Sequence, residues 1–178
     1  KKEMNDIPAA IEFYKKAVSR DDKKTGALAE LAKLYRRNKQ YNEAIATFTE
    51  YMTKQGDDKI KVADYLQLAQ MYIPAARQEG LTPEQKQDYR NKGDEALAKA
   101  LEKDPTAYQA WLLRAQMSIT DPRTAEEKPR EYYEKALEVM TANEKGSEAN
   151  YAQVYSYLAF YHVQKDNYTA ARKYTNLL

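Results

Sequence analysis

One short pattern of small and large residues recurs along the chain, and it constrains the fold more than any single side chain does. Ala32 recurs as Ala69, Ala115 and Ala159. Each alanine follows a larger residue by about one helical turn, and these larger residues are Leu28, Tyr65, Trp111 and Tyr155. A large side chain fills the space between two helices, while a methyl group lets the partner helix approach closely. The recurrence therefore predicts helices that pack in pairs.

A second small residue with a larger one a turn later marks the other helix of each pair. The pairs are Ala10 with Tyr14, Ala44 with Phe48, and Ala171 with Thr175; Gly93 with Leu97 fits loosely, and Pro129 with Tyr133 departs from the pattern. The clearest copy runs from Gly26 to Asp58. It resembles a tetratricopeptide repeat, with Leu28, Leu31, Ala32, Tyr35, Ala44 and Phe48 at the spacing of that family.

The resemblance extends over essentially the whole chain and implies an all-α fold, a right-handed α-α superhelix of about nine helices. The spacing from Ala10 to Ala44 is 34 residues, but Ala69 to Ala115 is 46 and Ala115 to Ala159 is 44. We expect a single array over residues 1–178, with a partial repeat at 1–24 and repeats at about 25–58, 59–106, 107–146 and 147–178. The last repeat is incomplete, so the chain reads as a fragment of a longer array.

Insertions account for the longer spacings. Pro74, Gly80 and Pro83 interrupt the helical pattern within one repeat, and Gly146 lies in a second break between repeats. Thr82 is the predicted N-cap of the following helix, with Pro83 as its first residue. This helix is predicted to run from about Pro83 to Lys103.

Composition excludes several classes of function. Acidic and basic residues are mixed along the chain, with a net charge of +2, which argues against nucleic-acid binding. No apolar stretch is long enough for membrane insertion. The chain has no cysteine, which excludes disulfides and thiolate metal sites. These features are compatible with either the cytoplasm or the periplasm.

Nothing in the sequence predicts an enzyme, and no cofactor or metal site is expected. His162 is the only histidine, and it occupies a position that reads Tyr35 and Tyr72 in other copies, so we interpret it as a packed ring. Most of the 16 tyrosines fall at helical spacing and are interpreted as inter-helix packing residues.

The family resemblance implies that the first helix of each repeat lines a concave groove that binds a protein or peptide. On these first helices, the residues next to the packing positions are expected to face the groove. The candidate peptide-binding residues are Lys33, Arg36, Arg37, Leu66, Gln70, Leu112, Gln116, Ser156 and Phe160. A glutamine amide can both donate to and accept from a peptide backbone, and the three cations can meet a carboxylate. The predicted function is a protein-binding or peptide-binding scaffold. The alternatives are a structural module that self-associates as a homo-oligomer through its terminal repeats, or a regulatory arm of a larger protein.

Overall fold

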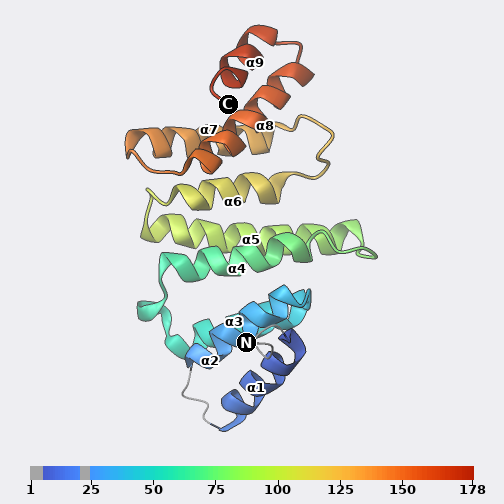
Figure 1. Ribbon diagram of the computed structural model, residues 1–178, viewed down its shortest axis with the longest axis vertical. Coiled ribbons are helices and arrows are strands. Elements are labelled where there is room, and N and C mark those ends of the chain that lie inside the picture. The colour runs from blue at the N-terminus through green and yellow to red at the C-terminus, as the bar shows by residue number, and fades with distance from the viewer. Residues whose placement is uncertain (1–5, 21–24) are drawn as a thin grey trace. The chain divides into compact units, whose positions relative to one another are not determined.

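The computed structural model describes residues 6–20 and 25–178, and within them the chain forms nine α-helices and no strand (Figure 1). The helices are α1 (Ile7–Arg20), α2 (Thr25–Arg37), α3 (Tyr41–Gln55), α4 (Val62–Ala75), α5 (Pro83–Lys103), α6 (Tyr108–Ser118), α7 (Glu127–Ala142), α8 (Glu148–Gln164) and α9 (Tyr168–Thr175). A 3-10 turn, η2 (Asp57–Lys59), precedes α4. The prediction of an all-α chain of about nine helices is confirmed, although residues 1–5 and 21–24 of the expected partial repeat lie outside the described residues.

The chain divides into two compact units, and the boundary between Gly93 and Asp94 falls inside α5. The N-terminal unit contains α1 to α4 and the first half of α5. In it each of α1, α2 and α3 packs on the helix that follows. Ala32 of α2, Ala44 and Phe48 of α3, and Met71 of α4 form its buried cluster.

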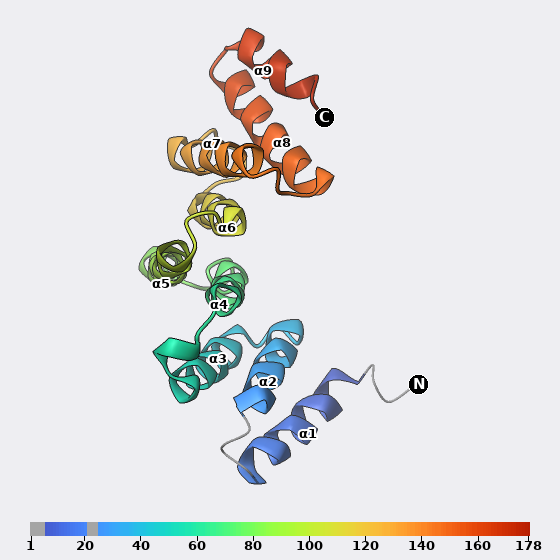
Figure 2. The ribbon, with the colours of Figure 1, turned by 90° about the vertical axis from the view of Figure 1, so that its left-hand side faces the viewer.

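The C-terminal unit contains the second half of α5 and α6 to α9. Here α6 packs on α7, α7 on α8, and α8 on α9, and Figure 2 shows the last two side by side as a hairpin. Its core joins three helices, with Leu112 and Ala115 from α6, Tyr133, Ala136 and Met140 from α7, and Val154 and Leu158 from α8. Both units therefore bury their apolar residues between successive helices.

The recurring alanines of the first helices are buried, as the packing pattern predicts. Ala32, Ala69 and Ala115 have no exposed surface, and Ala159 is nearly as buried. A methyl at these positions allows the neighbouring helix to lie close. Pro129, which departs from the pattern, is also fully buried, and it fits because it lies in the first turn of α7, where a helix needs no amide donor.

The interrupted segment before α5 also behaves as predicted. Helix α4 ends at Ala75, one residue after Pro74, and Gly80 adopts a positive φ of 79° in the turn. Helix α5 begins at Pro83 and ends at Lys103. Thr82 caps it, since its Oγ1 accepts from the Gln85 N–H at 3.2 Å while the Gln85 side chain accepts from the Thr82 N–H at 2.9 Å.

Candidate functional site

A pocket of about 190 Å³ opens between the first helices of two successive repeats in the N-terminal unit. Lys33 and Arg36 of α2 and Gln67, Gln70 and Met71 of α4 line it, and we call it the α2–α4 pocket. Residues 33 and 36 are one turn apart on α2, and residues 67, 70 and 71 recur at helical spacing on α4, so each helix presents one face. The structure thus brings together Lys33, Arg36 and Gln70 from the predicted set.

The cations of the pocket differ in their partners. The Lys33 ammonium donates to Glu30 Oε1 at 2.6 Å, an ion pair one turn apart on α2 in which both side chains remain substantially exposed. Exposed pairs of this kind stabilise a protein little, because water competes for both charges. The half-buried Arg36 guanidinium has no hydrogen bond or ion pair with any residue that the structure describes. It is therefore available to a ligand.

The α4 side of the pocket supplies two amides and an apolar floor. Gln67 is half-buried and Gln70 is exposed, and neither side chain is hydrogen-bonded within the described residues. Met71 is only 1% exposed and belongs to the core cluster of the unit. Together they combine free donors and acceptors with an apolar surface, which is the mixture that orients a bound peptide segment.

The sequence prediction missed Gln67 and Met71. Gln67 lies one turn before Gln70, so the same helical spacing that selected Gln70 could have found it. Met71 carries no such signal, because it is a buried member of the core cluster that also lines the pocket.

Other predicted groove residues lie outside this pocket. Arg37 is exposed on α2 and Leu66 is half-buried on α4, but neither lines it. In the C-terminal unit, Ser156 is exposed, while Phe160 is half-buried with its ring 6.1 Å from that of Tyr157. Gln116 is half-buried and has an interaction of its own.

Leu112 differs from the expectation. It is 4% exposed and packs in the core of the C-terminal unit, so it presents almost no surface to a ligand. The reason is that α6 is flanked by both α7 and α8, whose side chains cover a wider stripe of α6 than the alanine pattern alone indicates.

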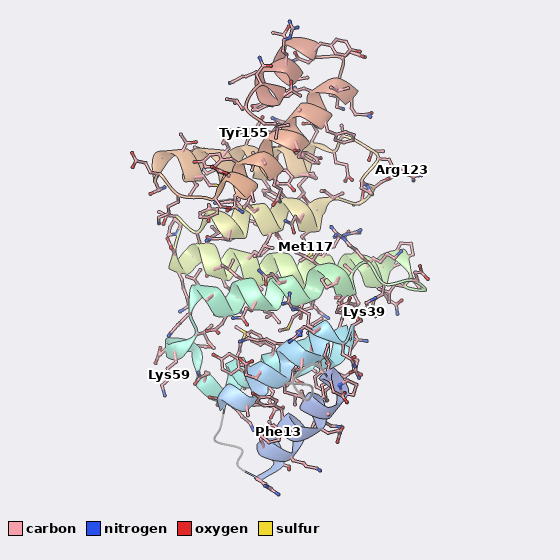
Figure 3. The ribbon with its side chains drawn as sticks, in the orientation of Figure 1. Phe13, Lys39, Lys59, Met117, Arg123 and Tyr155 are labelled. Carbon is pink, nitrogen blue, oxygen red and sulfur yellow. The ribbon has the colours of Figure 1, made fainter. Side chains whose placement is uncertain are left out.

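Two arginines in the C-terminal unit, Arg114 and Arg123, are paired with carboxylates, in contrast to Arg36. Arg114 holds Asp94 through two hydrogen bonds of 2.7 and 2.9 Å, and its guanidinium lies over the rings of Trp111 and Tyr132. Burial alone would lower the pKa of Arg114, but the hydrogen bonds and charge of Asp94 outweigh it and the pKa is raised. In the α6–α7 loop, hydrogen bonds from Arg123 lower the pKa of Asp121 to about 2. Figure 3 shows Arg123 at the outer edge of this loop.

The aromatic residues pack as expected from their spacing. The His162 ring stacks on Tyr174, with the centroids 5.7 Å apart and the planes 6° from parallel. Tyr133 and Tyr157 lie 4.7 Å apart, and Tyr151 and Tyr155 lie 5.9 Å apart. Gln153 donates to the Tyr133 hydroxyl at 3.1 Å, which ties α8 to α7.

Within the described ranges, no group of three His, Asp or Glu side chains is arranged to hold a metal ion. None of the helices described has the combination of length and apolar character needed to cross a bilayer.

Comparison with known proteins agrees with this architecture. The sequence model of the tetratricopeptide repeat family matches residues 2–68. No curated protein matches the sequence. Among solved structures, a crystal structure of MamA is similar with a TM-score of 0.70 and 20% identity, covering 99% of this chain and 89% of that one. TTC0263, a thermophilic tetratricopeptide-repeat protein of Thermus thermophilus, is similar with a TM-score of 0.57 and 16% identity, covering 98% of this chain and 92% of that one.

At these identities the solved structures show the fold alone, whereas the family model rests on the sequence of the N-terminal helices. The small residues Ala32 and Ala44 of the clearest copy fall inside the matched stretch and inside the buried cluster. Helix hairpins of the same kind make up both units. The sequence of residues 2–68 is therefore similar to the tetratricopeptide repeat family, and nearly the whole chain shares the fold of the solved structures.

Proposed function

We propose that this protein is a scaffold that binds a segment of a partner protein, and that the α2–α4 pocket is part of the binding face. Its fold supports protein interaction in general, since helical repeat arrays present extended concave surfaces to partners. Such proteins are in general scaffolds and not catalysts, and the proposal includes no enzymatic activity.

The observation that carries the proposal is the set of unsatisfied polar groups in the pocket. Arg36, Gln67 and Gln70 line it without a side-chain hydrogen bond to any described residue. An extended peptide has unpaired backbone N–H and C=O groups, which amide side chains can satisfy in both directions. The pocket therefore matches the backbone of a bound segment as well as one of its side chains.

The test begins with an array of random dodecapeptides with blocked ends, probed with the protein, followed by affinity measurements on the peptides that bind. Replacing Gln70 with Ala removes an amide contact to the backbone. We expect a similar loss for most peptides, about 0.5–1.5 kcal/mol for a lost hydrogen bond. The variant Gln67→Ala should behave in the same way.

Glu43→Ala on α3 and Lys99→Ala on α5 are the control variants, because both side chains are exposed and lie outside the pocket. They should leave binding unchanged. Peptides whose affinity responds to these controls but not to the glutamine variants would place the binding surface elsewhere and refute the proposal.

Self-association is the second candidate, and exposed apolar side chains on the first and last helices favour it. Phe13 of α1 is 67% exposed and Tyr168 of α9 is 64% exposed, and Leu177 and Leu178 are also exposed. Two copies could bury such surfaces against each other. Light scattering at two protein concentrations decides: a mass that rises to that of a dimer supports self-association, and a constant monomer mass supports the scaffold.

A further inference from the structure

We infer that the α2–α4 pocket receives the carboxylate of a glutamate side chain from an acidic segment of the partner, with Arg36 as the principal contact. This inference rests on the proposed function and names the ligand chemistry of the same site. It is carried by the charge balance of the pocket, by the accessibility of its cations and by the apolar part of its lining.

The pocket contains cations and no carboxylate. Lys33 and Arg36 contribute positive charge, and its other lining residues are neutral. The carboxylate of α4, Asp64, is buried and engaged elsewhere, since it accepts from the Tyr51 hydroxyl at 3.1 Å and from the Lys61 N–H at 2.8 Å. Asp64 therefore does not neutralise the pocket.

Arg36 is suited to a carboxylate because its planar guanidinium offers two parallel N–H donors. The same chain shows the arrangement where Arg114 binds Asp94 through two hydrogen bonds. Arg36 has no such partner among the described residues, although it is half-buried. A ligand carboxylate would give Arg36 the kind of partner that Asp94 provides for Arg114.

Lys33 provides a second cation that a ligand can recruit. Its present partner, Glu30, lies on the same helix, and both side chains are partly in water. Since such a pair is weak, a ligand carboxylate can share or replace Glu30 at the Lys33 ammonium. Removing the Glu30 charge should consequently strengthen the binding of an acidic ligand.

The lining favours an acidic side chain with an aliphatic stem. Its apolar atoms include the stems of Lys33 and Arg36 and, in small part, Met71, which is 1% exposed, and the methylene groups of glutamate can pack against them. Gln67 and Gln70 are placed beside Met71 to hold the backbone on either side of that glutamate.

The experiment uses the peptides selected from the blocked-end array, each compared with a copy in which every Glu is replaced by Gln. With the natural protein, we expect that replacement to weaken binding about tenfold or more, as for loss of a charge-assisted hydrogen bond. With Arg36→Gln most of the preference for the Glu peptide should be lost, and only the smaller part that Lys33 supports should remain. Arg37→Gln is the matched control, because Arg37 is the next residue but lies outside the pocket, and it should preserve the preference. Glu30→Gln should tighten binding of the Glu peptide.

The outcomes separate this inference from the proposed function. Peptides that respond to Gln70→Ala but bind equally well with Glu or Gln would overturn the carboxylate assignment and leave the scaffold intact. Peptides that ignore both Gln70→Ala and Arg36→Gln would overturn both. A preference that appears only when the peptide C-terminus is unblocked would assign the pocket to a chain terminus, and competition by inorganic phosphate but not by acetate would assign it to phosphate; either result overturns the glutamate assignment.

Discussion

At the scale of single residues, three helices end at a left-handed residue that is not glycine. Lys39, Glu144 and Asp166 have φ angles of 60°, 52° and 55°. In each case the residue after the left-handed one donates its N–H to the carbonyl five residues before itself, at 2.9 Å. An example is the hydrogen bond from the Gln40 N–H to the Tyr35 carbonyl. This hydrogen bond closes the last helical turn, and glycine normally occupies the left-handed position because any other side chain strains it. The helix ends therefore carry strain that a substitution can release.

Replacing Lys39 with Gly should raise the stability of the protein. The left-handed conformation costs about 1–2 kcal/mol for an L-residue. Glycine avoids this cost, but its greater conformational freedom in the unfolded chain offsets about 0.5–1 kcal/mol of the gain. We expect a net increase of about 0.5–1 kcal/mol in the free energy of unfolding, measured in urea. Lys39→Ala removes the charge but keeps the strained Cβ, so it should give no comparable gain; equal gains from both variants would contradict the argument.

Tyr157 makes the protein sensitive to alkali. Its hydroxyl donates to the carbonyl of Glu126 at 3.1 Å, and burial raises its pKa from 10.0 to about 12. Because the folded protein holds the phenolic proton more tightly than the unfolded chain, the stabilisation is complete below pH 10.0 and is lost as the pH rises toward about 12. Urea midpoints at about pH 9 and about pH 11 should fall more for the natural protein than for Tyr157→Phe. An identical fall in the two proteins would show that this group does not contribute.

At the scale of helices, packing positions were more predictable than the positions that line the pocket. The ends of α5 follow from Thr82, Pro83 and local capping chemistry, which act within one turn. The buried alanines follow from helical periodicity. Leu112 shows where prediction from the sequence fails. The part of α6 that is buried depends on α8, which is distant in the sequence. Gln67 and Met71 show it as well, since the pocket forms only once α2 and α4 lie next to each other.

Helix α9 should be the least protected part of the C-terminal unit. It buries only Ala171, whereas α8 buries Val154, Leu158, Ala159 and Tyr161. Segments with few buried apolar contacts open at low free-energy cost. Amide hydrogen exchange measured by mass spectrometry should therefore be faster in α9 than in α8. Equal protection of the two helices would mean that another surface covers α9, as a self-associated form would provide.

At the scale of the whole molecule, the proposed binding pocket lies in only one of the two units. The pocket with unpaired polar groups belongs to the N-terminal unit, as does the stretch that matches the family model. In the C-terminal unit, by contrast, Arg114 is paired with Asp94. We therefore expect the N-terminal unit to provide the specificity of binding, because Arg36 lacks the kind of carboxylate partner that Arg114 has among the described residues.

The central claim is that a partner segment lies on the face formed by α2 and α4, and paramagnetic relaxation in NMR tests it most directly. A selected peptide carrying a nitroxide label is added to the isotopically labelled protein, and the broadened amide signals are mapped. The account predicts that broadening centres on residues around Arg36 and Gln70, and that it disappears when excess unlabelled peptide is added. Broadening centred on the exposed side of α3, around Glu43, would contradict it.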